Sequence, residues 1–594
     1  MSAAAIRGRA AAVCLLAASA LLAVAGAEAA RPVAVRLIGI NDFHGNLEPA
    51  NLVLASEAVP ATSDDTPPLR IPAGGAAALA GLVEALRAGQ KHTLMVSAGD
   101  MVGAAPLIST LFKHESTVEI MNTIGMGVAI TGNHEFDAGV GELKRLVAGG
   151  CAATVPDGAV TSCALSTYGG MRFPFVSSNV LDADGKTVFA PSTVVRFAGI
   201  PVGFVGAVTK TLPTLVSPSG IAGLSIIDEA EAVNRAARRL QAQGVRAIVA
   251  LFHEGGELGT PQHRGKWNDA SCPDAHGPIF SIAERLLPEI TVIFTGHTHQ
   301  GYRCLIHGRT LIQGTSYGRG VSVVDVVLDP KTRRIVPSKT RSINLPVLNE
   351  RTDPAVRERI AATLPAPYAA IVRAARSDPA IASIVERYAV IVAPKAERPV
   401  ARIEGRFARG GLADSAAGRL IADAQLAATA APAQGGAQIA FMNPGGIRSD
   451  LDCIGTPPCT VTFGQAFTMQ PFGNTLVVMT LTGAQIKALL EAQSRPSGVE
   501  TTMLQPSAGF TYAWQPGAPV GSRASDLRLG GEPIVAERSY RVAVNSFLAE
   551  GGDGFAVLTE GTGRDGGAPD LDVLLEYLKT PRAPDSTARI TLLR

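Results

Sequence analysis

Five short apolar segments in the first half of the chain each end in a cluster of Asp, Asn or His. Carboxylate and carboxamide oxygens mixed with imidazole nitrogens are the ligands that a pair of divalent metal ions requires. The clusters therefore predict a metal site assembled from five loops. In chain order they are Asp42-Phe43-His44, Gly99-Asp100, Gly132-Asn133-His134-Glu135-Phe136-Asp137, His253-Glu254 and Gly296-His297-Thr298-His299.

The segments before these clusters, 33–40, 93–97, 128–131, 245–252 and 290–295, are rich in β-branched residues and predict strands buried on both faces. In sheets of that kind ligands bind at the carboxyl ends of the strands, which is where each cluster lies. A single Asp or His at such a point is more often a turn former or a helix cap. A fold needs no His at these positions, however, so five clusters in this order favour the metal site.

The series D-x-H, GD, GNHEFD, H and GHxH resembles the calcineurin-like metallophosphoesterases, and within them the secreted 5′-nucleotidases and UDP-sugar hydrolases of the bacterial periplasm. The resemblance implies an α/β fold whose N-terminal domain is a four-layer α/β/β/α sandwich with two mixed sheets. It also implies two divalent metal ions, Mn, Zn, Co or Mg. The implied ligands are Asp42, His44, Asp100, Asn133, His253, His297 and His299.

The resemblance divides these ligands between the two ions, with Asp100 bridging both. Asp42, His44 and His299 would complete one site, and Asn133, His253 and His297 the other. Some members of the family carry Gln where this chain has His299. A nitrogen donor there still suits Zn²⁺, Mn²⁺ or Co²⁺, so the departure bears on metal preference rather than on the existence of the site.

Two ions held about 3.5–4 Å apart lower the pKa of a shared water and clamp the oxygens of an in-line displacement at phosphorus. A metal-bound hydroxide would then attack, with no covalent enzyme intermediate. His134 and Asp137 are three residues apart at the start of a predicted helix, so their side chains can meet. In the family's pattern they form a catalytic dyad: Asp137 orients His134, which stabilises the transition-state oxygens or protonates the leaving alkoxide. The alternative is that Asp137 only favours the helix start.

The second half of the chain has no His beyond His307 and carries other motifs. A predicted strand at 439–442 ends in Asn443-Pro444-Gly445-Gly446-Ile447-Arg448, a glycine turn presenting an Arg, whose fork matches phosphate. Gln470-Pro471-Phe472-Gly473-Asn474 and the glycine-rich segment 546–555 place Phe472 and Phe547 on turns. Two exposed rings could sandwich a planar base, while packing within the turn or core is the alternative for each.

Together these motifs resemble the C-terminal 5′-nucleotidase domain, with its NPGGIR, PFGN and FLxxGGDG sequences. The resemblance implies that Arg448 binds the substrate phosphate and that Phe472 and Phe547 stack the base. A second phosphate arginine is expected at Arg409, with Arg406 in reserve, because the spacing around them departs from the family's. The remaining substrate-binding residues implied are Asn443, Gly446, Asn474 and Asp553.

At 594 residues the chain exceeds a single compact domain. We expect a catalytic domain at 31–345, a helical linker at 346–395 and a substrate-binding domain at 396–594. The linker contains two proline-bounded helical segments, 355–364 and 368–376, which could equally be a surface helix pair. The formal net charge of +2 provides no basic field for a nucleic acid polymer, so the expected partner is a small nucleotide.

The first residues predict a secretory signal, 1–29, in which Arg7 and Arg9 precede an apolar stretch and Ala27-Glu28-Ala29. No later segment predicts a membrane span, so we expect an exported protein, periplasmic or extracellular. Six cysteines remain after Cys14, an even set that suits an oxidising compartment and lacks the CxxC spacing of a zinc site. Proximity favours Cys151 with Cys163 and Cys453 with Cys459, which leaves Cys272 with Cys304.

The sequence therefore predicts a dinuclear metal-dependent phosphohydrolase that removes the 5′-phosphate of nucleoside monophosphates. The same site could serve a 2′,3′-cyclic nucleotide phosphodiesterase or a UDP-sugar or NAD pyrophosphohydrolase, and the sequence does not separate these activities. A non-catalytic nucleotide-binding surface protein is the alternative of another class, and the intact ligand set argues against it. Substrate binding split between domains implies closure about the linker.

Overall fold

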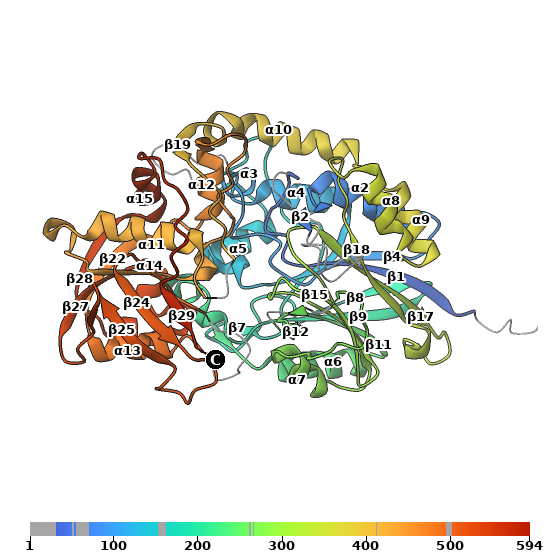
Figure 1. The fold of residues 1–594 in the computed structure, drawn as a ribbon. Coiled ribbons are helices and arrows are strands. Elements are labelled where there is room, and N and C mark those ends of the chain that lie inside the picture. Colours follow the sequence, from blue (N-terminus) through green and yellow to red (C-terminus); the bar gives the residue numbers. More distant parts are fainter. Residues whose placement is uncertain are drawn as a thin grey trace, which may run out of the picture.

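The computed structural model describes residues 31–49, 53–54, 71–152, 162–260, 263–264, 266–410, 413–494 and 502–593. The predicted signal, 1–29, lies outside these ranges. The chain forms two lobes, one blue to green and one orange to red, and the long helix α10 (Pro379–Ala396) runs across the top from one to the other (Figure 1). Within the described ranges, no helix combines the length and apolar character that crossing a membrane requires.

The first lobe contains two mixed six-stranded sheets. The first sheet has the order β18-β17-β1-β4-β5-β6, and β1, β4 and β5 run parallel. Its strands are β1 (Val33–Ile40), β4 (Thr93–Ser97), β5 (Met126–Ile130), β6 (Phe175–Val176), β17 (Gly320–Leu328) and β18 (Arg341–Pro346). Because β1, β4 and β5 point the same way, the loops that follow them meet at one edge of the sheet.

The second sheet has the order β15-β16-β14-β11-β9-β8, with β9, β11 and β14 parallel. Its strands are β8 (Ser192–Phe197), β9 (Ile200–Val208), β11 (Ala247–His253), β14 (Ile290–Thr295), β15 (Gly301–Ile306) and β16 (Arg309–Gly314). Three of the predicted strands, 33–40, 93–97 and 290–295, match β1, β4 and β14 residue for residue. The other two differ from β5 and β11 by one or two residues at each end.

The two sheets pack face to face and are covered by helices on their outer sides. Apolar side chains of both sheets, among them Val96, Val128, Leu251 and Phe294, form the core between them. The first sheet is covered by α2 (Ala76–Arg87) and α4 (Glu115–Ile124), and the second by α6 (Glu229–Ala242) and α7 (Pro278–Glu284). The predicted four-layer sandwich is confirmed.

The predicted linker consists of helices that pack on the first lobe. It contains α8 (Pro354–Ala362), α9 (Ala366–Ala374) and α10, of which the last was predicted only as part of a helical linker. Ile381, Tyr388 and Val392 of α10 are buried in the same core as α2 and α4. The Tyr388 hydroxyl also donates to Glu119 of α4. These contacts join α10 to the catalytic lobe along most of its length.

The second lobe contains a five-stranded sheet, β23-β20-β27-β22-β28, and a four-stranded sheet, β26-β25-β24-β29. The strands are β20 (Ile439–Met442, as predicted), β22 (Thr475–Thr482), β23 (Gln505–Pro506), β24 (Phe510–Trp514), β25 (Ala524–Leu529), β26 (Glu532–Pro533), β27 (Ser539–Asn545), β28 (Thr562–Pro569) and β29 (Ile590–Leu592). They pack with α11 (Ala416–Thr429), α12 (Phe463–Met469), α13 (Gly483–Glu491), α14 (Ser546–Ala549) and α15 (Asp570–Tyr577) around cores separate from those of the first lobe.

Shorter elements complete the fold. In the first lobe they are α3 (Leu107–Thr110), α5 (Gly139–Ala148) and the paired strands β2 (Val53–Leu54) with β3 (Ile71–Pro72), β7 (Val180–Leu181) with β10 (Ser225–Ile226), and β12 (Gly259–Thr260) with β13 (His263–Arg264). In the second lobe β19 (Pro399–Ile403) pairs with β21 (Cys459–Thr462).

All three predicted disulfides are present. Cys151 is bonded to Cys163, Cys272 to Cys304, and Cys453 to Cys459. Cys272 and Cys304 are buried in the core beneath α7. Their disulfide joins the loop before that helix to β15. Disulfides of this kind persist in oxidising compartments, which agrees with the expected export.

The contact between α2 and the linker leads to a prediction about stability. A Cβ added to Gly81 of α2 would lie 1.5 Å from the carbonyl oxygen of Arg376, so Gly81→Ala must push the linker away from the catalytic lobe. We expect the substitution to lower the free energy of unfolding, measured by urea denaturation, by about 1–3 kcal/mol. Gly141→Ala in α5 is the matched control, because no atom lies within 4 Å of its new Cβ. The free energy of unfolding of Gly141→Ala should equal that of the wild type or exceed it by about 0.5–1 kcal/mol.

Candidate metal centre and substrate cleft

The five loops that carry the predicted metal ligands converge where the two sheets end. Asp42 and His44 follow β1, Asp100 follows β4, and Asn133 follows β5. His253 is the last residue of β11, and the remaining two ligands, His297 and His299, follow β14. Five of these residues have a positive backbone φ, between 48° and 74°: Asp42, His44, Asp100, His297 and His299. Such conformations are costly for residues other than glycine and cluster at functional sites.

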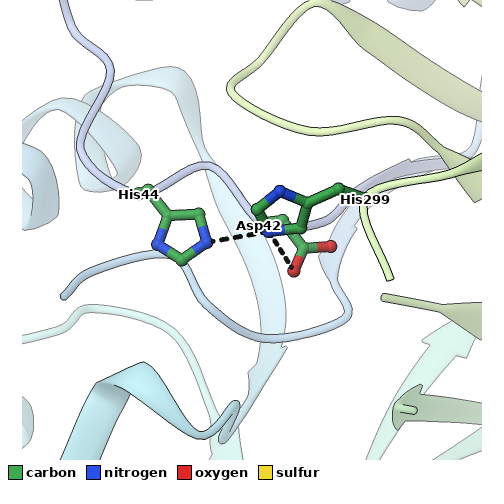
Figure 2. Close-up of side chains that lie close together, drawn as sticks. All are labelled: Asp42, His44 and His299. Atoms are coloured by element: carbon green, nitrogen blue, oxygen red, sulfur yellow. Dashed lines mark hydrogen bonds and ion pairs between the residues drawn. The ribbon is translucent and has the colours of Figure 1, made fainter. Parts of the chain in front are cut away.

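The first group that can hold an ion consists of Asp42, His44 and His299, whose ligand atoms all lie within 4.8 Å of one another. Figure 2 shows the two imidazoles and the carboxylate turned toward a common point. The Nε2 atoms of His44 and His299 are 3.2 Å apart, and His299 Nε2 lies 3.3 Å from Asp42 Oδ1. All three residues come from the predicted first site.

The second group that can hold an ion consists of Asp42, Asp100 and His253. Asp100 Oδ2 lies 3.1 Å from His253 Nε2 and 3.6 Å from His44 Nε2, which places this carboxylate between the two groups. The Asn133 Oδ1 atom is 3.0 Å from both His253 Nε2 and His297 Nδ1. The structure therefore brings all seven predicted ligands together, and Asp42 belongs to both groups.

Hydrogen bonds on the far side of two imidazoles decide which nitrogen faces the centre. His44 Nδ1 lies 2.9 Å from the Gly103 carbonyl oxygen, and His253 Nδ1 lies 2.9 Å from that of Ala98. A carbonyl oxygen only accepts, so each Nδ1 carries a proton, and in the neutral ring each Nε2 presents a lone pair to the centre. This arrangement fits a divalent ion.

Burial and mutual charge set the ionisation of the ligands. Burial raises the pKa of the Asp42 carboxyl, but the neighbouring His299 and His253 outweigh it and lower this pKa to about 2. The pKa of Asp100 is likewise held well below its usual range by His253 and His134 against the effect of burial. Burial, with the charge of His253, lowers the pKa of His297 to about 3. Burial lowers the pKa of His253, but the carboxylates of Asp100 and Asp42 outweigh it and raise this pKa to about 10, so His253 must release a proton when it binds a metal ion.

His134 and Asp137 lie beside this centre and contact one another, as predicted. His134 Nδ1 is 3.0 Å from each carboxylate oxygen of Asp137, and the Ala104 backbone N–H donates to Asp137 Oδ2 at 3.1 Å. Burial lowers the pKa of His134, but the charges of Asp137 and Asp100 outweigh it and raise the pKa. His134 begins a 3₁₀ turn, His134–Phe136, and Asp137 follows it, so the pair does not lie at the start of an α-helix. Its geometry suits a proton donor or a charged stabiliser.

Glu135 holds two of the ligand loops together, a role that sequence reasoning missed. Its carboxylate accepts hydrogen bonds from the backbone N–H groups of Asp100, Met101 and Gly132 at 2.9, 2.8 and 2.6 Å. In return, Asp100 Oδ1 accepts from the His134 N–H at 2.8 Å. The loops after β4 and β5 are thereby joined in both directions. Glu135 was visible in the GNHEFD motif, but nothing in the sequence tells where its side chain points.

The second lobe reaches directly into the metal centre. Arg448 Nη2 lies 3.4 Å from His44 Nε2, and the Phe472 ring stacks on the His134 imidazole with centroids 5.7 Å apart and planes at 27°. The Arg448 guanidinium also lies 5.9 Å from the Phe472 centroid. Two predicted substrate-binding residues, Arg448 and Phe472, therefore contact His44 of the predicted metal centre and His134 of the predicted dyad.

Phe547 and its neighbours form the other side of the cleft. Gly552 packs on the Phe547 ring so closely that an added Cβ would lie 2.5 Å from it, so one face of the ring is covered. Asn443 is buried, and its amide donates to Asp553 Oδ2 at 2.8 Å while its carbonyl oxygen accepts from Asn545 at 3.0 Å. Because both ends of the Asn443 amide are engaged, this residue positions Asp553 in the cleft.

The remaining predicted substrate residues line the same cleft. Asn474 Oδ1 accepts from Ser546 Oγ at 3.2 Å, and Gly446 closes the turn that presents Arg448. Arg409 also lines the cleft, and its Nη1 donates to the Arg448 carbonyl oxygen at 2.9 Å. Arg406 is instead paired with Asp450 and with Asp452. The geometry favours Arg409 over Arg406 as the second phosphate arginine.

The cleft between the lobes has a volume of about 2040 Å³. Pockets for single small ligands are typically about 300–1,000 Å³, so this space exceeds what one nucleotide requires. Both lobes line it, with His134, Asp137 and predicted metal ligands contributed by the first lobe and the two Phe rings by the second. The residues that carry these features are Asp100, Asn133, His134, Asp137, His297, His299, Arg409, Arg448, Phe472, Phe547 and Asp553.

Comparison with known families agrees with this architecture. Residues 35–301 match the calcineurin-like phosphoesterase family, and residues 396–560 match the 5′-nucleotidase C-terminal domain. The chain belongs to the family that joins these two domains. Members of the calcineurin-like group bind divalent metals, which suits the ligand groups described above.

Individual relatives are consistent with this assignment. The sequence is 31% identical to the endonuclease YhcR of Bacillus subtilis (strain 168) over 94% of this chain, although the match spans only 41% of that protein. It is 28% identical to a probable 5′-nucleotidase of Treponema pallidum (strain Nichols) over 91% of each chain. The crystal structure of a 5′-nucleotidase precursor from Thermus thermophilus superimposes with a TM-score of 0.71, at 26% identity, over 94% of this chain and 99% of that one.

The role of Glu135 in joining the ligand loops can be tested by Glu135→Gln. The amide nitrogen of Gln cannot accept from backbone N–H groups, so at least one buried donor loses its partner, at a cost of about 1–3 kcal/mol. We expect weaker Mn²⁺ binding by calorimetry and a lower melting temperature. Glu358→Gln, in an exposed pair with Arg373, serves as the control and should bind Mn²⁺ as the wild type does. Unchanged metal affinity in Glu135→Gln would show that the loops hold their positions without this carboxylate.

Proposed function

We propose that the protein is a metal-dependent phosphohydrolase that removes the 5′-phosphate from nucleoside monophosphates. One observation carries the proposal: residues of the two lobes meet at one point, with Arg448 beside His44 and Phe472 stacked on His134. A phosphate that contacts the metal ligands therefore lies next to an arginine fork and an aromatic ring. That combination suits a substrate with a phosphate at one end and a planar base at the other.

Each part of the site has a distinct task in this proposal. The seven ligands would hold two divalent ions, which would supply Lewis acidity and a hydroxide nucleophile at neutral pH. His134, oriented by Asp137, donates to the phosphoryl oxygens or to the leaving oxygen. Arg448 and Arg409 bind the phosphate as charged donors, and Phe472 and Phe547 stack the base. Asp553, held by Asn443, accepts from the ribose or the base.

We further propose that the chain is divided at the predicted boundaries, 31–345, 346–395 and 396–594, and that it is exported. The division is supported by the separate cores of the two lobes. Export is supported by the three disulfides and by the signal pattern in residues 1–29. Whether the protein is periplasmic or extracellular depends on the cell envelope of its host.

A second candidate is a nucleotide phosphodiester or pyrophosphate as substrate, hydrolysed at the same metal centre. Two observations favour it: the cleft of about 2040 Å³ has room beyond a mononucleotide, and a relative that is 31% identical is named an endonuclease. Incubating the Mn²⁺-loaded protein with 5′-AMP, 2′,3′-cyclic AMP, UDP-glucose and NAD, with products separated by chromatography, distinguishes the two candidates.

The metal requirement is the first test of the proposal. Chelation should abolish phosphate release from 5′-AMP, and Mn²⁺, Co²⁺ or Zn²⁺ should restore it. Asp100→Asn should reduce kcat/KM more than His44→Ala, because the Asp100 carboxylate lies between the two ligand groups whereas His44 belongs to one. Asp184→Asn changes an exposed carboxylate that does not line the cleft and serves as the control. Full activity in chelated enzyme shown by elemental analysis to be metal-free would refute the proposal.

The division of labour between the lobes gives a second test. Phe472→Ala combined with Phe547→Ala should leave hydrolysis of a small aryl phosphate nearly intact and lower kcat/KM for 5′-AMP about 30-fold or more. The estimate follows from base stacking on an aromatic ring, worth about 1–3 kcal/mol per contact. Gly552→Ala should reproduce part of the effect, because its Cβ would displace the Phe547 ring. Equal losses on both substrates would assign the rings to the fold.

A further inference from the structure

Tyr317 lies beside the metal centre in a backbone conformation that requires explanation. Its φ of 60° places it in the left-handed region, which is rare for a bulky residue. Its N–H donates to the Asp42 carbonyl oxygen at 2.6 Å, so the loop after β16 is fixed to the loop that carries Asp42 and His44. The unusual conformation is thus held in place by a ligand loop.

The Tyr317 ring contacts two of the predicted ligands. Its centroid lies 5.6 Å from that of His44 and 5.2 Å from that of His299, in edge arrangements with interplanar angles of 61° and 78°. The ring lines the cleft between the lobes. It therefore forms the wall of the metal centre on the side of the first ligand group.

The hydroxyl group of Tyr317 is buried, the Arg409 guanidinium approaches its oxygen, and no described residue accepts a hydrogen bond from it. Buried donors nearly always have an acceptor, so the phenol proton calls for a ligand that supplies one. The Arg448 Nε atom, in the same cleft, is also buried without a partner among the described residues. Arginine can only donate, and a phenol donates readily. The two groups together define a site for an acceptor.

The charges around the phenol indicate the sign of that acceptor. Three arginines surround the Tyr317 phenol. These are Arg448 and Arg409 of the second lobe and Arg319 of the first, whose guanidinium lies 5.1 Å from the ring centroid. A site that presents two unpaired donors among three positive charges favours an anion with several oxygens.

We propose that the Tyr317 hydroxyl donates a hydrogen bond to an oxygen of the phosphoryl group that is transferred, and that it forms with Arg448 a phosphate subsite shared by the two lobes. This inference rests on the proposed phosphohydrolase function. Tyr317 belongs to the catalytic lobe and Arg448 to the substrate lobe, so the subsite is complete only when the lobes are as close as in this structure. Tyr317 thereby gives the catalytic lobe a contact to phosphate that does not pass through the ions.

Tyr317→Phe separates this role from a purely structural one, because the variant keeps the ring and its contacts with His44 and His299 and removes only the hydroxyl. The probe is inorganic phosphate, whose binding to the Mn²⁺-loaded protein is measured by calorimetry and by competitive inhibition of aryl phosphate hydrolysis. We expect phosphate affinity to fall about 10-fold or more, the usual effect of losing a hydrogen bond to a charged group. Metal content by elemental analysis should equal that of the wild type.

The matched control is Tyr168→Phe, which removes a buried hydroxyl that donates to the Leu146 carbonyl oxygen away from the cleft. Its phosphate affinity should not change. Wild-type phosphate affinity in Tyr317→Phe, or a loss of metal from that variant, would overturn the inference. Inorganic phosphate and the aryl phosphate both lack a nucleobase. Failure of the wild-type protein to hydrolyse 5′-AMP would therefore reject the nucleotidase assignment alone. Failure of the wild-type protein to bind phosphate at all would reject both proposals.

Discussion

The rest of the structure depends on bringing two ionised carboxylates together in a buried place. Asp42 and Asp100 are 0% and 1% exposed, and like charges so close and so poorly hydrated repel each other strongly. The surrounding imidazoles and the N–H groups of His134 and His297 offset part of this repulsion. Divalent ions offset the remainder, so the arrangement that is costly for folding is the one that makes the site bind metal.

Two mixed sheets are an effective way to hold such a group. Parallel neighbours within each sheet bring loops that are far apart in the sequence to a single edge, and packing the sheets face to face brings the two edges together. The core absorbs the strain, because the positive φ values occur in loops anchored on strands whose ends next to these loops are buried. Glu135 completes the anchoring by tying the loop after β4 to the loop after β5.

Features that depend on neighbouring residues in the chain could be predicted from the sequence, whereas features that depend on contacts between distant segments could not. Strand limits such as 33–40 and 290–295 follow from local patterns of β-branched residues, and the ligand types follow from what comes after each strand. The segment of α10 was predicted only as part of a helical linker, because the helix begins at Pro379 and contains Pro394 and because its stability comes from packing on α2 and α4. The structural role of Glu135 and the proposed role of Tyr317 depend on contacts with loops that are distant in the sequence. The local sequence around each residue does not reveal these contacts.

The contact between the lobes has a consequence for catalysis. Phe472 covers one face of His134, and Arg448 adds a positive charge beside His44, so the second lobe changes both the hydration and the electrostatics of the site that the first lobe builds. In a low-dielectric cleft a guanidinium next to a developing negative charge has far more effect than it has in water. In the proposed function the second lobe therefore has two tasks: its Phe rings select the substrate, and Arg448 completes the charge pattern of the transition state. A molecule that fails to fit between the lobes loses both at once.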